Sequence, residues 1–113
     1  MKKRACFHEL AEFELNDAAA FFESKTAGLG VRFLSAVEKA VAHIEQHPEA
    51  SPIIRQQLRR KLVWKFPYSI MFTIKSDHIR ILAIANQSAA RSTGARASNH
   101  YPEETGCRHP YLN

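Results

Sequence analysis

The 113-residue sequence has little of what marks special protein classes. It contains only 4 Gly, 5 Pro and 2 Cys, so it is neither collagen-like nor a disulfide-rich secreted domain. Its longest uninterrupted apolar runs, residues 18–22 and 81–85, are far shorter than the ~20 residues of a membrane-spanning helix. The composition, 45% hydrophobic and 24% charged, is that of a globular domain with one hydrophobic core.

The sequence also predicts no secretion signal. Residues 1–4 are basic, as at the start of a signal peptide, but charged and polar residues between positions 8 and 14 interrupt any apolar segment that might follow. Cys6 and Cys107 stand at opposite ends of the chain and give no disulfide framework, which fits a reducing compartment. We therefore expect a cytoplasmic protein with no membrane segment and no structural disulfide.

The net charge of +5 is distributed unevenly along the chain. Residues 1–49 carry six Lys or Arg and eight Asp or Glu, which gives −2. Residues 50–87 carry seven basic residues against Asp77 alone, which gives +6. Because a localised field guides a charged partner, whereas a dispersed field mainly aids solubility, the middle of the chain is predicted to attract an acidic partner.

The first half of the chain shows helical spacing. From Leu10 to about Ser24, apolar residues recur at intervals that place them on one face of an amphipathic helix. A turn-like stretch follows, and a second helix is predicted from Leu29 until Pro48 prevents its continuation. The short segment 4–8 is predicted to form a first strand. The two helices are expected to pack against each other in antiparallel orientation.

After Pro52 the spacing changes to the alternation of strands. In the first alternating segment, one parity is apolar and is predicted to face the core: Leu58, Leu62, Trp64 and Phe66. Residues 68–75 are predicted to form a half-buried strand with Phe72 in the core. Residues 79–85 are apolar on both parities apart from Arg80, which predicts a central strand.

These patterns together predict an α+β fold, in which an N-terminal strand and an antiparallel helical hairpin pack on a small antiparallel β-sheet. Residues 88–113 contain Leu112 as their only large aliphatic residue. Such a segment buries too little apolar area to offset the ~1–2 kcal/mol per residue that backbone ordering costs. We therefore expect one domain over residues 1–87 and a polar, mobile tail over residues 88–113.

Several short strings resemble the RelE/ParE superfamily of toxins from bacterial type II toxin–antitoxin systems. They lie in matching order and spacing between roughly residues 5 and 87: 28–30, 33–34, 37–38, 48–52, 59–63, 66–70 and 81–85. The resemblance implies a helical hairpin on a small antiparallel sheet. It also implies a toxin of a plasmid stabilisation system, neutralised by a cognate antitoxin with which it forms a hetero-oligomer.

The superfamily contains two activities on one scaffold, so the site must decide between them. RelE-like members cleave messenger RNA on the ribosome, which requires groups that accept and donate protons and cations that stabilise the phosphorane. The resemblance assigns the catalytic role to four basic residues: Arg59, Lys61, Lys65 and Arg80. The acid–base partner is missing, because Asn86 stands where relatives often have His, and residues 89–94 depart from the Arg-Arg-Pro-x-Tyr-Trp pattern of many relatives.

ParE-like members inhibit DNA gyrase and share no catalytic constellation, so the missing residues do not count against that branch. We therefore favour a ParE-like gyrase inhibitor over a ribosome-dependent endoribonuclease. A third hypothesis is an inactive domain that still binds its antitoxin. No cofactor is expected under any of these readings. Cys107 and His109 lack the usual ligand spacing of a zinc site. His43 and His47, at i and i+4 near a helix C-terminus, could ligate a metal, but that end of the helix dipole favours an ordinary histidine, so we interpret them as structural and expect no metal.

The expected partner-binding surface has a basic and an apolar part. The basic face consists of five residues: Arg59, Arg60, Lys61, Lys65 and Arg80. The alternative role for this face is a solvated strand that prevents edge-to-edge pairing. The apolar contacts to the antitoxin are predicted to come from Phe13, Phe21 and Met71, although side chains of this kind are also commonly tucked into the core or its rim.

Overall fold

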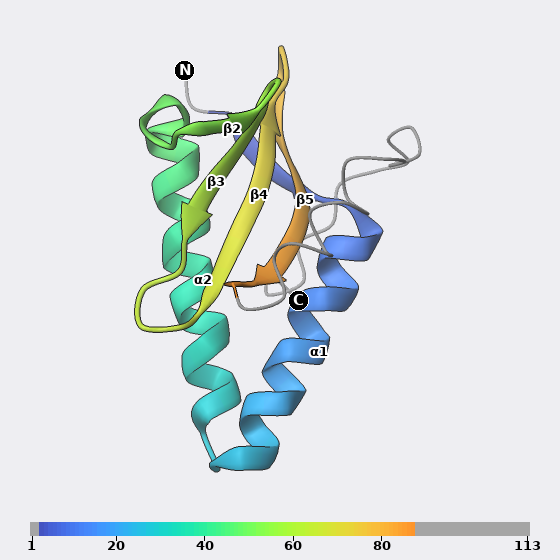
Figure 1. Ribbon diagram of the computed structural model, residues 1–113, viewed down its shortest axis with the longest axis vertical. Helices are drawn as coiled ribbons and strands as arrows, with labels where there is room; N and C mark the ends of the chain where they lie inside the picture. Colours follow the sequence, from blue (N-terminus) through green and yellow to red (C-terminus); the bar gives the residue numbers. More distant parts are fainter. Residues whose placement is uncertain (1–2, 88–113) are drawn as a thin grey trace.

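The computed structural model describes residues 3–87 of the chain (Figure 1). The elements follow one another as β1 (Arg4–Phe7), α1 (Glu9–Lys25), α2 (Leu29–Gln46), a 3₁₀ turn η1 (Pro48–Ala50), β2 (Ile53–Arg55), β3 (Leu58–Leu62), β4 (Tyr68–Ile74) and β5 (His78–Asn86). The predicted first strand and both predicted helices are confirmed to within two residues at either end. The strand β2 was not predicted, because its three residues are too few to show a period.

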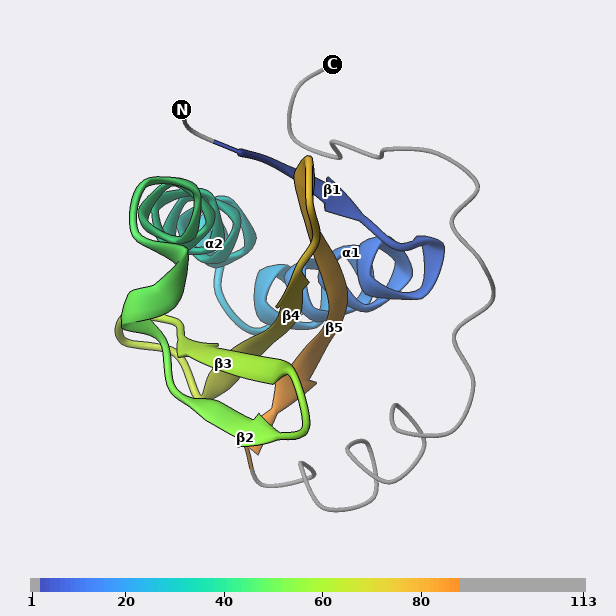
Figure 2. The same ribbon diagram turned by 90° about the horizontal axis from the view of Figure 1, so that it is seen from above.

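The strands form one mixed sheet in the order β1-β5-β4-β3-β2. The three pairings among β2, β3, β4 and β5 are antiparallel, but β1 pairs with β5 in parallel. The α+β fold with its helical hairpin is confirmed, and the parallel pairing of β1 with β5 makes the sheet mixed. The helical hairpin carries the chain from β1, at one edge of the sheet, to β2 at the other edge. Figure 2 shows β1 and the β2–β3 hairpin at opposite ends of this sheet. The segment predicted as central, β5, lies between β1 and β4.

The hydrophobic core lies between the sheet and the two helices. Its largest members have no appreciable exposure and come from both layers: Phe7, Leu15, Phe33, Ile44, Ile70, Phe72, Ile79 and Ile81. A group of aromatic rings, Phe22, Phe33, Phe66 and Tyr68, fills the end nearest the helical turn, with Phe22 and Phe66 centroids 5.0 Å apart. Each fully buried large side chain contributes about 1.5–3 kcal/mol relative to exposure, so this layer holds the hairpin on the sheet.

Two glutamates attach the helices to the strands through backbone amides. The Oε1 of Glu14 on α1 accepts a hydrogen bond from the N–H of Ile84 at 2.8 Å. The Oε2 of Glu45 on α2 accepts one from the N–H of Ala5 at 2.8 Å. These bonds join positions 70 and 40 residues apart in sequence, so each carboxylate serves the fold rather than a ligand.

The turn between the helices depends on Glu23 and two glycines. The carboxylate of Glu23 accepts hydrogen bonds from Gly28 N and Gly30 N, at 2.9 and 3.0 Å, and these bonds lower its pKa. Gly28 has a φ of 87°, which favours glycine, and a Cβ at Gly30 would lie 2.7 Å from the carbonyl oxygen of Ala19. The close approach of the two helices at this turn therefore requires glycine at position 30.

The predicted parity of the segment 58–66 is wrong for the strand and for Trp64, whereas Phe66 packs against the core as predicted. Arg59 and Lys61 pair with Phe72 and Ile70 of β4, whose side chains face the helices, so these basic residues lie on the helix side of the sheet. Val63 continues their parity and is buried, whereas Leu62 and Trp64 are exposed. The strand ends at Leu62, and the chain then leaves the sheet, so the alternation of the following residues no longer reports a sheet face.

The strand β4 is buried on both faces, not on one as predicted. Ser69 and Met71, on the face away from the helices, are nearly inaccessible, and Met71 packs with Ala83 and Ala85 of β5. Met71 is therefore not the surface contact that we predicted. The strands pair with a register shift between Met71 and Phe72, which places Ile81 and Ile84 on the same side of the sheet.

Two further expectations concern the cysteines and the tail. Cys6 is disulfide-bonded, which corrects the expectation of no structural disulfide. Cys107 and the predicted mobile tail, 88–113, lie outside the described residues. Within residues 3–87, neither helix has the length and apolar character needed to cross a bilayer.

Candidate functional site

A groove of about 970 Å³ lies between α2 and the segment that leaves β3. In Figure 1 the β3–β4 loop runs alongside the middle of α2. One wall comes from α2, between Leu29 and His43, and the other from residues 61–67. We call this hollow the α2–loop groove. Three of the side chains that α2 contributes to its lining are small: Ser35, Ala36 and Ala40.

The rims of the α2–loop groove are basic. Arg32 and Lys39 are seven residues apart on α2, which places them two turns apart on one face of the helix. Lys61 and Lys65 stand on the opposite wall. No Asp or Glu is among the described residues that line the groove, so its positive charge is not neutralised from within. Low-dielectric walls strengthen the field inside such a hollow.

The floor of the groove is apolar. It is formed by Phe22, Val63 and Phe66, which also belong to the core or pack against it. Trp64 stands at the edge and is 76% exposed, and it is the one tryptophan of the sequence. A large aromatic side chain that is left in water beside an apolar hollow is typical of a surface that binds a partner.

His43 extends the basic stripe of α2 by one further turn. The positive charge of Lys61 is the main cause that lowers the pKa of His43, and partial desolvation and the neighbouring His47 act in the same direction. The rings of His43 and His47 lie with their centroids 5.3 Å apart. The imidazole of His43 is therefore kept neutral to lower pH than an isolated histidine, and protonating it adds a positive charge to the groove.

The five residues of the predicted basic face lie at separate places in the structure. Lys61 and Lys65 line the groove, and Arg60 is exposed on the other face of β3. Arg59 is committed to the fold, because its Nη1 donates to the carbonyl oxygens of Ser51 at 2.7 Å and Glu49 at 3.3 Å. Arg80 is 9% exposed and lies within the sheet layer rather than on an open surface.

The four residues that the RelE resemblance nominated as catalytic do not converge on one accessible site. Only Lys61 and Lys65 share the groove, whereas Arg59 binds backbone carbonyls and Arg80 is buried. Among the described lining residues the one histidine is His43, which the sequence pattern indicated as structural. Sequence reasoning missed Arg32, Lys39 and Trp64 as site residues. The sequence signal that was available is the spacing of seven residues between Arg32 and Lys39, which places both on one face of a helix.

The predicted apolar contact residues differ in their placement. Phe13 and Phe21 are 66% and 51% exposed on α1, outside its buried face, as their positions predicted. Together with Leu10 they form an apolar stripe on the side of α1 that does not pack on the sheet. Lys25 lies over the ring of Phe21, with its Nζ 5.2 Å from the centroid. This stripe is on α1 and is separate from the α2–loop groove.

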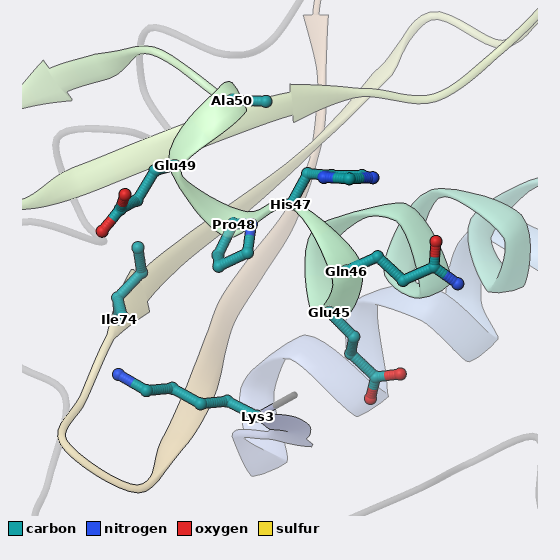
Figure 3. A pocket seen from close by; sticks show the side chains of 8 residues that line it. All are labelled: Lys3, Glu45, Gln46, His47, Pro48, Glu49, Ala50 and Ile74. Carbon is teal, nitrogen blue, oxygen red and sulfur yellow. The ribbon is translucent and has the colours of Figure 1, made fainter. Parts of the chain in front are cut away.

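A second hollow, of about 740 Å³, lies between the end of α2, η1 and the start of the described chain (Figure 3). Its charged residues are Lys3, Glu45 and Glu49, and Figure 3 shows that their charged ends point in different directions. Glu45 already accepts the amide of Ala5, and the Nζ of Lys3 donates to the carbonyl oxygen of Lys75 at 2.6 Å. This hollow therefore presents no convergent set of groups for a ligand. Among residues 3–87, no group of three or more His, Cys, Asp or Glu could hold a metal ion.

No protein-family model and no curated protein matches the chain. Among solved structures, the chain is similar to a chain of the chromosomal ParDE TA (toxin–antitoxin) system from P. aeruginosa, with a TM-score of 0.56 and 18% sequence identity. The match covers 75% of this chain and 96% of that chain. At this identity the likeness shows the fold, two helices packed on a mixed sheet, which is a ParE-like toxin fold.

Proposed function

We propose that this protein is the toxin of a type II toxin–antitoxin pair, of the kind that stabilises plasmids, and that it inhibits DNA gyrase in the ParE-like manner. The observation that supports the toxin role is the fold likeness to a chain of a ParDE toxin–antitoxin system. The ordered strings that resemble the RelE/ParE superfamily lie on the same elements, from the helical turn to β5. The partner implied by this role is a cognate antitoxin.

Gyrase is favoured over messenger RNA because of the placement of the basic residues. A nuclease needs its proton-transfer groups and its phosphate-binding cations around one scissile bond. In the described residues, Arg59 donates to a backbone carbonyl and Arg80 is buried, and this placement favours a function that does not require the four nominated cations to act together. An inhibitor that works by binding needs a surface and no such constellation, and the exposed groove and the α1 stripe supply surfaces.

Purified full-length protein should inhibit supercoiling by gyrase and leave messenger RNA intact in a purified translation system. Expression in bacteria should arrest growth, and co-expression of the small protein encoded beside the gene should restore it. The double variant Lys39→Glu/Lys61→Glu tests whether the groove matters for either result, and Arg60→Glu, a charge reversal on the neighbouring but opposite face, is the matched control. Circular dichroism would verify that every variant is folded.

Each other result identifies a different function. Site-specific messenger cleavage on programmed ribosomes would contradict gyrase inhibition and favour a RelE-like endoribonuclease. Binding of the neighbouring gene product without growth arrest, gyrase inhibition or cleavage would identify an inactive antitoxin-binding module. Normal growth together with no binding would contradict the toxin role itself.

A further inference from the structure

Cys6 in strand β1 is disulfide-bonded, although residues 3–87 contain no other cysteine. The sequence has one further cysteine, Cys107. We propose that Cys6 and Cys107 form a reversible disulfide, and that this bond holds the segment 88–113 on the face of the sheet that is turned away from the helices. Oxidation docks the segment, and reduction releases it. This redox switch does not depend on the proposed toxin role.

Cys6 lies on the outer face of the sheet, which we define as the face away from the helices. Side chains alternate along a strand, and the neighbours Ala5 and Phe7 belong to the core between the sheet and the helices. Cys6 pairs with Arg80 of β5, which also stands between two core residues of its strand. The side chains of Cys6 and Arg80 are therefore neighbours on the outer face.

The burial of Cys6 limits what the other half of its disulfide can be. Only 2% of the residue is exposed. The Cα atoms of bridged cysteines lie about 4.4–6.8 Å apart, so a second copy of the chain would have to bring its own buried Cys6 within that distance. The side chains around Cys6 prevent this approach. A segment of the same chain that lies over Cys6 meets the distance and also covers the sulfur.

The place where β5 ends allows Cys107 to reach Cys6. Strand β1 runs parallel to β5, and the register pairs Cys6 with Arg80, a few residues before the strand ends at Asn86. The return from Asn86 to the level of Cys6 is about 20 Å, at about 3.3 Å per residue. Residues 87–107 span up to about 70 Å when extended, so the bond needs no rearrangement of the sheet.

The outer face is buried elsewhere as well. Its cluster of Met71, Ala83 and Ala85 is 5% exposed or less, and all described residues of this cluster come from strands. A segment docked over these strands accounts for their burial. Residues 88–113 contain Leu112 as their only large aliphatic residue, so their contacts alone do not offset the cost of ordering the backbone. The docking therefore depends on the covalent bond and ends when the bond is reduced.

The bond forms by thiol–disulfide exchange with a small disulfide such as oxidised glutathione. The thiolate of one cysteine attacks the small disulfide, which gives a mixed disulfide and releases one small thiol. The thiolate of the other cysteine then displaces the second small thiol. Two protein thiols are thereby oxidised to one disulfide, and the small disulfide is reduced to two thiols. Arg80 beside Cys6 favours this exchange, because a neighbouring cation stabilises a thiolate.

Mass spectrometry of the full-length protein tests the bond. The protein is equilibrated with oxidised or reduced glutathione, denatured, and treated with iodoacetamide. After oxidised glutathione we expect a monomer without label, and a protease digest that contains one pair of peptides joined through Cys6 and Cys107. After reduced glutathione we expect a label on both cysteines. Cys107→Ser should show no internal bond under either condition, and it leaves the buried Cys6 in place.

Oxidation of Met71 by hydrogen peroxide tests the docking. Met71 lies on the outer face, so the rate of its conversion to the sulfoxide, followed by peptide mass, reports access to that face. The disulfide form should react severalfold more slowly than Cys107→Ser, in which the segment is not held. Thermal melts of both proteins would verify that faster oxidation of Met71 does not come from unfolding.

Four outcomes would overturn the proposal. They are labelled thiols after oxidised glutathione, a lasting glutathione adduct in place of the internal bond, a covalent dimer linked through Cys6, or equal rates of Met71 oxidation in the disulfide form and in Cys107→Ser. All of these measurements use the purified protein alone. Their outcome is therefore separate from growth arrest and gyrase inhibition, which test the toxin role.

Discussion

The segment 58–66 and the strand β4 have similar alternating sequences but opposite relations to the core. In β4, the apolar parity predicted from the sequence, which includes Ile70 and Phe72, faces the helices and is buried. In the preceding segment Leu62 and Trp64 of the apolar parity are exposed, and the basic residues Arg59 and Lys61 face the helix side. Alternation therefore reveals that a strand has two different faces, but the position of the strand in the sheet decides which face is inside.

The difference follows from what each strand covers. The strand β4 lies in the middle of the sheet, over the core between the helices. The strand β3 lies further toward the edge, where its helix-side positions meet the flank of α2 and the turn η1 rather than the core. Arg59 and Lys61 suit this place, because a long side chain can reach a carbonyl or the solvent from beneath the sheet.

The largest effect is expected for Phe72→Ala in β4. Phe72 is fully buried, and removing a large core side chain costs about 3–5 kcal/mol, from lost burial and the cavity that remains. Chemical denaturation of the variant and the wild type would measure the change. Phe72→Leu keeps most of the volume and should cost clearly less. A loss below about 1 kcal/mol for Phe72→Ala would place β4 outside the core.

A smaller effect is expected for Arg59→Ala in β3. The variant loses the hydrogen bonds to the carbonyl oxygens of Ser51 and Glu49 and should be destabilised by about 1–2 kcal/mol. Arg60→Ala, at the adjacent exposed position, should stay within about 0.5 kcal/mol. Equal losses for the two variants would mean that the helix-side attachment of Arg59 contributes nothing.

Trp64→Ala should change stability by no more than about 0.5 kcal/mol, because the side chain is mostly in water. Phe72→Ala also removes a large aromatic side chain, but from the core, so its much larger loss of stability provides the contrast. A fall in melting temperature of more than about 5 °C, equivalent to roughly 1 kcal/mol in a domain of this size, would show that Trp64 is part of the core after all.

The smallest effect is expected for the pH dependence of folding stability that His43 causes. The pKa of His43 is lowered mainly by Lys61, so the unfolded chain binds the proton more readily than the folded one. The stability associated with the neutral imidazole is therefore present above the ordinary pKa of 6.5 and is lost as the pH falls through and below that value. Lys61→Met should raise the pKa of His43 and weaken this dependence.

An NMR titration of the His43 ring, alongside stability measured between about pH 5 and 8, would follow both consequences. Arg60→Met removes a charge from the same strand on the opposite face and should leave the titration of His43 unchanged. If the two variants shifted His43 equally, the cause would be the net charge of the domain and not the position of Lys61 in the groove.

The sequence by itself determined the local elements. The helical period, the glycines of the turn and Pro48 set the bounds of α1 and α2 closely, because periodicity and backbone restrictions act within a few residues. The alternation of residues 68–74 and the apolar run before Asn86 gave β4 and β5 for the same reason. The resemblance of short strings to a toxin superfamily then indicated how these elements assemble.

Only the tertiary structure decided which side of β3 faces inward, that both faces of β4 are buried, and that Arg32 and Lys39 of α2 stand opposite Lys61 and Lys65. The charge count along the chain placed the basic character in residues 50–87, but half of the groove's cations come from the acidic first segment. A site is made by side chains that are close in space. Their separation in sequence leaves no local pattern, because the distance between α2 and the β3–β4 loop is set by the packing of the whole sheet on the helices.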